Sequence, residues 1–314
     1  MSGGSRRGQG QEGDTGEPRP RVTIQDLARM KTAGDPIVMV TAYDYPTAKI
    51  ADEAGVDIVL VGDSAANCVL GYDSTVPVGM DEMLVLTRAV RRGLERPLLI
   101  GDLPYGSYEA SNELAIENAQ RMVKDAGCDA VKLEGGGQSA ERARAMVAAG
   151  IPVMGHVGLT PQTAGSIGGM KAQGRDADGA VRVARDAESL QLAGCFAIVF
   201  EAVPQAVAEL ITARLSVPTI GIGAGNATSG QVLVMHDLVG LNEGPMARFV
   251  KQYGDARGAM LESVREYARE VRDRSFPGPD HVYSVDPGEL DEFRRRLEEG
   301  DLDSSYSWDW EPLG

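Results

Sequence analysis

The sequence has few cysteines, no long run of apolar residues and no excess of basic side chains. Its three cysteines are far apart and lack the CxxC spacing of a zinc site or a redox pair, so we expect Cys68, Cys128 and Cys195 to be buried as small hydrophobic residues. No stretch of about 18 apolar residues is present that could span a membrane. The start of the chain also lacks the charged and then apolar pattern of a secretory signal, so we expect a cytoplasmic protein.

Acidic side chains outnumber basic ones. The 31 Lys and Arg residues and the 46 Asp and Glu residues give a formal net charge of −15 at pH 7. Nucleic acids and anionic membranes are bound by concentrated Lys and Arg, so this balance argues against both as partners. The 314 residues, of which 43% are hydrophobic, are enough for a large globular core, and a single α/β barrel reaches this length.

Composition divides the chain into three parts. Residues 1–21 are rich in Gly, Pro and charged side chains and have almost no apolar ones, so we expect a disordered tail. Residues 22–275 form the expected catalytic domain. Residues 276–314 combine a turn rich in Pro and Gly with an acidic amphipathic stretch, and we expect a C-terminal extension whose role the sequence leaves open.

Short apolar runs alternate with longer segments of helical character in the expected catalytic domain. This alternation is typical of βα units with a parallel sheet. Eight such runs predict an α/β fold, a (β/α)8 TIM barrel, with an N-terminal capping helix at residues 24–33. The connection GAGNATSGQ before the eighth run has room for only one helical turn, which leaves an irregular barrel open. The predicted strands are residues 37–43, 58–62, 98–101, 130–133, 152–156, 197–200, 219–223 and 232–236.

Polar residues follow most of the predicted strands at their carboxyl ends, where βα barrels carry their active sites. Asp63, Asp102 and Glu134 follow three successive strands and supply only oxygen, as a hard divalent cation such as Mg2+ prefers. Any one of these acids alone could equally cap a helix or pair with a basic side chain. Three of them at neighbouring strand ends favour a metal site.

Lys132 and Glu134 are two residues apart, so on a strand their side chains point to the same face. A lysine buried near an acidic metal site could hold a substrate carboxylate or an oxyanion. It could instead form a Schiff base, as in barrel aldolases, or only neutralise Glu134. The residues alone leave these three roles open.

Glu201 and His156 close two further predicted strands. An apolar run leads into Glu201, and partial desolvation would make its carboxylate a stronger base, so we predict that Glu201 transfers a proton. The alternative is a structural carboxylate bonded to backbone amides. His156 either hydrogen-bonds the substrate or packs as a neutral core histidine.

Two other segments carry weaker signals. The loop at residues 168–175 is expected over the mouth of the barrel, where Lys171 and Arg175 could meet an anionic cosubstrate. His236 is expected to be structural.

Ten short motifs, in order along the chain, resemble those of the ketopantoate hydroxymethyltransferase family. The motifs are TAYD (41–44), VGDS (61–64), GYDSTVPV (71–78), GDLPYGSY (101–108), VKLEGG (131–136), GHVGLTPQ (155–162), GGMKAQGR (168–175), FEAVP (200–204), GIGAG (221–225) and VMHD (234–237). The resemblance covers residues 22–283, and ten motifs in one order are far more specific than any one of them. The N-terminal tail and the region after Tyr283 lie outside it.

The resemblance implies a Mg2+-dependent transfer of a hydroxymethyl group from 5,10-methylenetetrahydrofolate to 3-methyl-2-oxobutanoate. The product would be 2-dehydropantoate, for pantothenate and coenzyme A synthesis. The implied ligands of one Mg2+ per subunit, direct or through water, are Asp63, Asp102 and Glu134. The implied substrate-binding residues are Asp63, Ser64, Asp102 and Lys132. Glu201 would accept the C3 proton, and His156 is an auxiliary candidate.

The resemblance also implies a homo-oligomer, since members of the family form barrel oligomers that are often decamers. Two other activities stay open from the residues. Another Mg2+-dependent 2-oxo-acid aldolase or lyase of the same barrel type would need no folate, and a Schiff-base aldolase using Lys132 would be insensitive to chelators. A barrel with no catalytic role would show no Mg2+ binding.

Overall fold

The computed structural model describes residues 20–165, 168–244 and 246–300. Most of the expected disordered tail at residues 1–21 therefore lies outside the described residues. Contacts divide the chain into two compact units, between Ala256 and Arg257, and each is described by itself. The division falls before the expected boundary at residue 275.

The first unit is a closed barrel of eight parallel strands that neighbour one another in sequence order. Pairing of Ile37 with Gly230 joins the last strand to the first and closes the barrel. The predicted (β/α)8 barrel is thus confirmed. Only the eighth strand is displaced, since it begins two residues early and His236 lies in the helix after it. The strands are β1 (Ile37–Thr41), β2 (Ile58–Val61), β3 (Leu98–Asp102), β4 (Ala130–Lys132), β5 (Val153–Gly158), β6 (Ala197–Glu201), β7 (Thr219–Ile222) and β8 (Gly230–Leu233).

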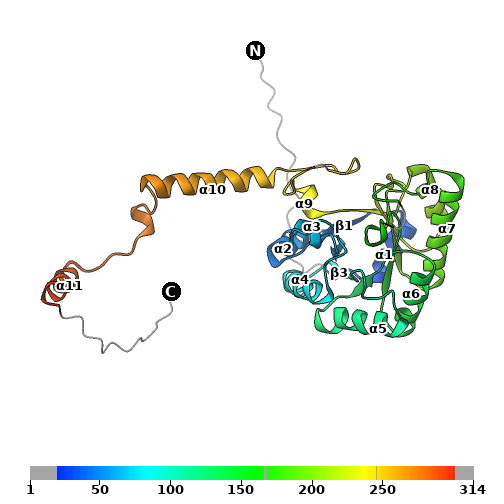
Figure 1. Ribbon diagram of the computed structural model, residues 1–314, viewed down its shortest axis with the longest axis horizontal. Helices are drawn as coiled ribbons and strands as arrows, with labels where there is room; N and C mark the ends of the chain where they lie inside the picture. The colour runs from blue at the N-terminus through cyan, green and yellow to red at the C-terminus, as the bar shows by residue number, and fades with distance from the viewer. Residues whose placement is uncertain (1–19, 166–167, 245, 301–314) are drawn as a thin grey trace, which may run out of the picture. The chain divides into compact units, whose positions relative to one another are not determined.

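Helices follow most of the strands and pack around the barrel (Figure 1). The connection between β7 and β8, residues 223–229, contains no helix, and only the four-residue helix α9 directly follows β8. The irregular seventh unit is therefore confirmed. The helical segments described in this unit are α1 (Ile24–Ala33), α2 (Tyr45–Glu53), α3 (Ala65–Cys68), α4 (Met80–Gly93), α5 (Asn112–Gln120), η1 (Arg121–Asp125), α6 (Gln138–Ala148), η2 (Pro161–Thr163), α7 (Ala177–Leu192), α8 (Gln205–Arg214) and α9 (Met235–Leu238).

Helix α1 is the predicted capping helix, with the same bounds. It begins with a capping box, in which the Thr23 hydroxyl accepts from the backbone N–H of Asp26 and the Asp26 carboxylate accepts from the N–H of Thr23. Gly34 ends it with a φ of 79°, a conformation that costs glycine little. Leu27 is fully buried in one cluster with Ile37 and other residues near the strand starts. The helix therefore closes the amino end of the barrel and leaves the carboxyl end for a site.

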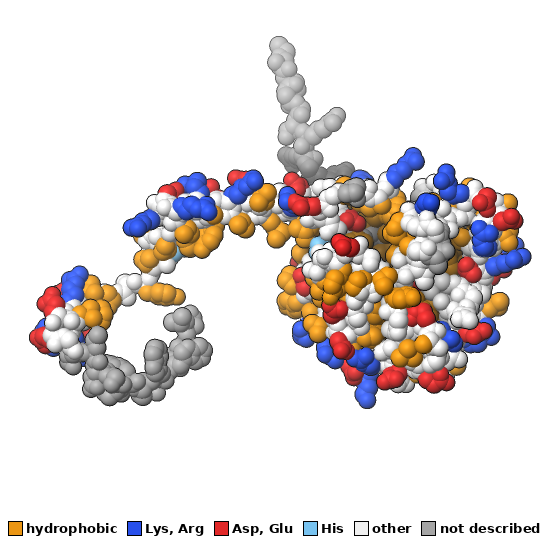
Figure 2. Space-filling model, viewed as in Figure 1, with side chains coloured by type: hydrophobic (Ala, Val, Ile, Leu, Met, Phe, Trp, Pro, Cys, Tyr) orange, Lys and Arg blue, Asp and Glu red, His pale blue; other side chains and the backbone are white. Residues whose placement is uncertain are grey.

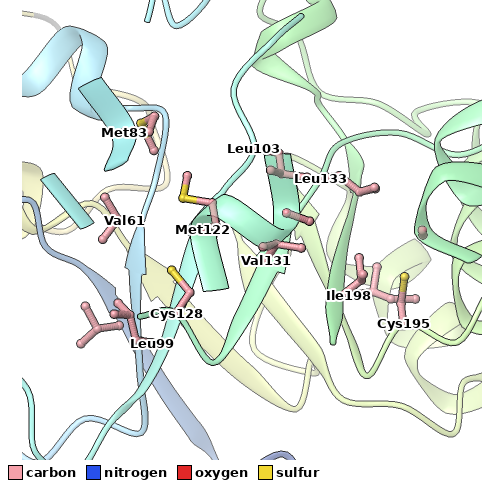
Figure 3. Packing of buried hydrophobic residues seen from close by; sticks show 14 of the residues in the cluster. Val61, Met83, Leu99, Leu103, Met122, Cys128, Val131, Leu133, Cys195 and Ile198 are labelled. Carbon is pink, nitrogen blue, oxygen red and sulfur yellow. The ribbon is translucent and has the colours of Figure 1, made fainter. Parts of the chain in front are cut away.

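A second apolar layer fills the space between the outer faces of the strands and the surrounding helices (Figure 3). Met122 is fully buried there, and burial of such a side chain stabilises the fold by about 1.5–3 kcal/mol. Close packing requires glycine at residue 101, where an added Cβ would lie 2.6 Å from the sulfur of Cys128. Cys128 and Cys195 are buried as expected, whereas Cys68 is only partly buried.

In the part of the second unit that the structure describes, which ends at residue 300, there are two helices and a short turn of 3-10 helix. These are α10 (Ala256–Asp273), η3 (Pro279–His281) and α11 (Pro287–Glu299), the last of which forms the predicted acidic amphipathic stretch. Apolar side chains recur along one side of α10 and are exposed (Figure 2), namely Met260, Val264, Tyr267 and Val271. Within the described ranges, every helix is too short or too polar to cross a membrane.

Candidate active site

The predicted site residues meet at the carboxyl rim of the barrel. They line one cavity of about 210 Å³, together with apolar residues such as Val199, Ile222 and Phe249. The structure thus brings together all seven, which are Asp63, Ser64, Asp102, Lys132, Glu134, His156 and Glu201. A larger hollow of about 750 Å³ lies elsewhere, by the turn from α1 to β1 and the end of α8, and none of the seven lines it. The small cavity therefore carries the candidate chemistry.

Lys132 and Asp102 form the central ion pair of this cavity. The Lys132 Nζ lies 2.7 Å from both carboxylate oxygens of Asp102 and 3.6 Å from Oε1 of Glu134. Burial by itself would lower the pKa of Lys132, but the charges of Asp102, Glu134 and Asp63 outweigh burial and raise it above its usual value. Lys132 is therefore a buried ammonium ion that faces three carboxyl groups.

Asp63 adds a carboxyl group from the end of β2. Its backbone N–H donates to Oδ2 of Asp102 over 3.1 Å, and its own Oδ2 accepts from the Gln162 side-chain amide over 3.0 Å. Burial raises the pKa of Asp63 well above its usual range, and repulsion by Asp102 and Glu134 raises it further. Ionisation of Asp63 is therefore unfavourable in the metal-free protein, because Lys132 does not offset burial and the charges of the neighbouring acids.

Glu134 is buried beside two basic side chains. Its Oε2 accepts from the backbone N–H of Gln162 over 3.1 Å. Its Oε1 lies 3.3 Å from Nδ1 of His156, but within the described part of the chain no atom is aligned to give Oε1 a hydrogen bond. Burial opposes ionisation of Glu134, yet Lys132 and His156 lower its pKa below the usual value. Glu134 is thus an ionised acid with one oxygen still to be satisfied.

His156 lies between two carboxylates. Its Nε2 is 3.3 Å from Oε2 of Glu201, across the ring from the contact with Glu134. Burial would lower the pKa of His156, but the charge of Glu134 and the nearby carboxylate oxygens of both acids raise it to about 9. His156 was expected either to hydrogen-bond the substrate or to pack as a neutral core histidine. Its position between two carboxylates does not match the second interpretation.

Glu201 ends β6 and faces the cavity. Its side chain is 15% exposed, which makes it the most accessible carboxyl group of the cluster. The expected partial desolvation is therefore present. A proton acceptor needs access to the substrate and an orienting partner. Glu201 lines the cavity and has His156 beside it.

The side chains that hold these residues in place were not predicted from the sequence. Tyr43 is buried, and its hydroxyl lies 2.8 Å from the hydroxyl of Ser64. Gln162 hydrogen-bonds two of the acids, and Tyr108 hydrogen-bonds Gln162. The motifs that carry the resemblance contain all three residues, but no charge or strand-end position marked them.

The loop at residues 168–175 reaches the cavity through an apolar side chain. Met170 lines the cavity, whereas Lys171 and Arg175 are exposed and do not line it. The loop is tied to the barrel by the backbone N–H of Gln173, which donates to the carbonyl of Ala202. The two basic residues are thus outside the part of the site that the structure defines.

The three acids suit a divalent cation in chemistry and charge. They are oxygen donors, they are buried together, and Glu134 keeps one unsatisfied oxygen. Among the described residues, however, no three acidic, His or Cys side chains are arranged as a coordination shell. Both oxygens of Asp102 are engaged by Lys132. The donor set fits Mg2+, and Lys132 competes for one member of it.

A parallel barrel that buries three carboxyl groups, a lysine and a histidine at its carboxyl rim defines the class of (β/α)8 enzymes, whose sites lie at that rim. The chain belongs to the ketopantoate hydroxymethyltransferase family, whose family model matches residues 21–279. It is 51% identical over 266 residues to 3-methyl-2-oxobutanoate hydroxymethyltransferase of Heliobacterium modesticaldum, covering 85% of this chain and 96% of that protein.

Relatives from distant organisms are similar over the same region. The 3-methyl-2-oxobutanoate hydroxymethyltransferase of Aeropyrum pernix is 52% identical to this chain, and the aligned region covers 84% of this chain and 96% of that protein. The Arabidopsis thaliana protein named 3-methyl-2-oxobutanoate hydroxymethyltransferase 1, mitochondrial, is 48% identical over 92% of this chain and 86% of its own.

Solved structures share the fold at low sequence identity. A crystal structure of phosphonopyruvate hydrolase gives a TM-score of 0.55 at 16% identity and covers 91% of this chain and 99% of that chain. A structure of 2,3-dimethylmalate lyase, described as a PEP mutase/isocitrate lyase superfamily member, gives 0.53 at 16% identity with coverage of 91% and 99%. These likenesses support the barrel fold alone.

Proposed function

We propose that this protein transfers a hydroxymethyl group from 5,10-methylenetetrahydrofolate to 3-methyl-2-oxobutanoate. The product is 2-dehydropantoate, a precursor of pantothenate and coenzyme A. Membership of the family supports the reaction, since the relatives carry the name of this activity. The observation that carries the proposal is the single cavity in which a buried acid cluster faces the more accessible Glu201.

Asp63, Asp102 and Glu134 are the proposed holders of one Mg2+ per subunit. When bound, the ion supplies positive charge beside the carbonyl oxygen of the 2-oxo acid, which makes the neighbouring C–H bond more acidic. Support comes from the repulsion of Asp63 by the other two acids, which a bound cation would relieve, and from Oε1 of Glu134, which has no hydrogen bond among the described residues.

Glu201 is the proposed proton acceptor at C3 of the 2-oxo acid. The carboxylate removes the C3 proton, and the electron pair left at C3 then forms the new bond to the methylene carbon of the folate. The bonds from that carbon to the two folate nitrogens break, and water supplies the hydroxyl group. The C3 proton and the second proton of the water end on the nitrogens of the tetrahydrofolate that leaves. His156 orients Glu201 from a distance of 3.3 Å. The apolar side chains that line the same cavity, such as Val199 and Ile222, would contact the isopropyl group and exclude water from it.

Lys132, Ser64, Asp63 and Asp102 are the proposed substrate-binding residues. The raised pKa keeps Lys132 protonated, so it can stabilise negative charge that develops on the substrate oxygen. A protonated, ion-paired lysine is a poor nucleophile, which disfavours a Schiff-base aldolase. An aldolase or lyase without folate is disfavoured by the family to which the chain belongs.

Assembly and location belong to the same proposal. We expect a homo-oligomer, a decamer as in the family, and a cytoplasmic enzyme. Analytical ultracentrifugation of the full chain would test the first. For the second, the plant relative is named mitochondrial, so fractionation of the source cells is the test.

Exchange of the C3 proton of 3-methyl-2-oxobutanoate in D2O, followed by proton NMR, tests the first half of the reaction without folate. We expect exchange that requires Mg2+, that EDTA abolishes, and that Glu201→Gln slows by about 100-fold or more. Glu209→Gln, which changes an exposed glutamate on α8, is the matched control. Addition of 5,10-methylenetetrahydrofolate should then yield 2-dehydropantoate, detected by mass spectrometry. Its absence with an active C3 exchange would overturn the assigned donor, and absence of both would overturn the function.

A further inference from the structure

Gln162 occupies an unusual position between the acids of the cavity. It lies in η2, the short helical turn that follows β5 after two intervening residues, and the residue is 3% exposed. It does not line the cavity, although its neighbour Pro161 does. Whatever Gln162 does for the reaction, it therefore does through the residues that it contacts.

The contacts of Gln162 join two acids that come from different strands. Its side-chain Nε2 donates to Oδ2 of Asp63 over 3.0 Å, and its backbone N–H donates to Oε2 of Glu134 over 3.1 Å. Asp63 follows β2 and Glu134 follows β4, so one residue fixes one oxygen on each. The other oxygen of each carboxyl group is left for a different partner.

The orientation of the Gln162 amide is set by its other neighbours. Nε2 also donates to the carbonyl of Leu103 over 3.0 Å, and Oε1 accepts from the hydroxyl of Tyr108 over 2.7 Å. A flipped amide would place its oxygen against two oxygens, those of Leu103 and Asp63, so the observed orientation is the one that satisfies every group. Burial raises the pKa of Tyr108, which keeps its hydroxyl a donor.

Tyr108 supports Glu134 as well. The backbone N–H of Glu134 donates to the Tyr108 hydroxyl over 3.3 Å, and the Tyr108 side chain is 1% exposed. Gln162 and Tyr108 therefore hold Glu134 by its backbone and by its side chain. Both partners are neutral, so they orient the acids without cancelling the negative charge that a cation needs.

We propose that Gln162, oriented by Tyr108, is a positioning residue that presents Asp63 and Glu134 to the divalent cation of the reaction. The inference rests on the proposed function, because it takes these acids as the Mg2+ site. Loss of partners that orient ligating carboxylates typically weakens metal binding by about 10-fold to 100-fold. The effect should therefore fall on Mg2+ affinity before it falls on the proton transfer itself.

The test uses the metal-free, full-length protein and Mg2+ titration by calorimetry. Gln162→Met keeps the length of the side chain and removes its three hydrogen bonds, while the backbone bond to Glu134 stays. We expect a Mg2+ Kd about 10-fold to 100-fold higher than that of the unchanged protein. Tyr108→Phe keeps the buried ring and removes one hydroxyl, and we expect a smaller rise of about fivefold.

Gln191→Met is the matched control. Gln191 also holds a neighbouring loop, through bonds from the backbone and hydroxyl of Ser216 to its Oε1, but it is remote from the cavity. It should lower the melting temperature and leave the Mg2+ Kd unchanged. This control separates a general loss of packing from a loss of positioning.

Three results would overturn the inference. The first is that Gln162→Met folds and binds Mg2+ with the same Kd as the protein without substitutions. The second is that Gln162→Met does not fold and Tyr108→Phe binds Mg2+ with that same Kd. The third is that the protein without substitutions binds no Mg2+, which contradicts the proposed function as well. If that protein binds Mg2+ and exchanges the C3 proton, but both variants have the same Mg2+ Kd as it has, only the role of Gln162 is contradicted.

Discussion

The ammonium nitrogen of Lys132 lies 2.7 Å from both carboxylate oxygens of Asp102, and both side chains are buried. Removing one partner of such a pair leaves a buried charge without compensation, which typically costs about 3–5 kcal/mol. Lys132→Met is therefore expected to lower the free energy of unfolding by about 3 kcal/mol or more in the metal-free protein. Urea unfolding at neutral pH measures this value.

A surface pair gives the matched control for that prediction. The Nζ of Lys49 lies 3.8 Å from Oε1 of Glu95, which is largely exposed, so Lys49→Met should cost less than about 1 kcal/mol. Lys132→Met should also lower the free energy of unfolding by less when Asp102→Asn is already present, because the side chain left at residue 102 is then neutral. Equal losses at Lys132 and Lys49 would contradict the buried ion pair.

Asp63 contributes repulsion to the metal-free protein. Since burial and the neighbouring acids Asp102 and Glu134 disfavour its charge, Asp63→Asn is expected to stabilise the metal-free protein by on the order of 1 kcal/mol. The same change should abolish the stabilisation that Mg2+ gives the unchanged protein. Melting temperatures in EDTA and in excess Mg2+ measure both effects, and a variant that is destabilised in EDTA but still responds to Mg2+ would contradict the assignment.

The fold could be predicted from the sequence because βα alternation is a local signal. Apolar runs of four to seven residues and glycines after helices mark the units, and seven of the eight strands begin within one residue of the predicted start. The eighth strand was placed two residues late because VLVMH continues the apolar run of β8 into α9. Hydrophobicity alone does not distinguish the end of a buried strand from the first turn of a helix.

The charged site residues were predictable for a different reason. Strand ends converge in a barrel, so Asp102 and Glu201, each the last residue of its strand, had to meet at one rim. Gln162 and Tyr108 could not be found in this way, because they lie in connections and their role depends on contacts between residues more than 50 positions apart. Such contacts have no periodic signature in the sequence.

His236 gives a pH-dependent contribution to stability. Burial lowers its pKa below the usual 6.5, against the charges of Asp44 and Asp237, which raise it. The folded protein therefore binds this proton less tightly than the unfolded chain, so stability falls as the pH drops through about 6.5. We expect His236→Asn to make the decline in melting temperature between neutral and mildly acidic pH shallower. His281→Asn, at an exposed histidine, should leave the slope unchanged, and equal slopes in all three proteins would contradict the prediction.

The acidic surface predicts a response to salt. With a net charge of −15, repulsion between surface charges opposes folding, and added salt screens it. The melting temperature should therefore rise between low and high KCl. Exposed ion pairs such as those of Arg269 with Glu266 and Asp273 work in the opposite direction, since salt weakens them too. A melting temperature that does not change with KCl would show that the two effects cancel and would contradict the prediction.

His156 should act on the reaction through Glu201. Its Nε2 lies 3.3 Å from Oε2 of Glu201, and the proposed proton acceptor has no other basic neighbour of this kind among the described ion pairs. His156→Gln is expected to lower kcat for C3 exchange by about tenfold or more, while KM for the 2-oxo acid changes by less than about threefold. Residues that act as one unit give losses that do not add, so the double variant with Glu201→Gln should be no slower than Glu201→Gln alone. If the decreases in kcat were additive in the double variant, His156 would act through Glu134 and the acids around it and not through Glu201.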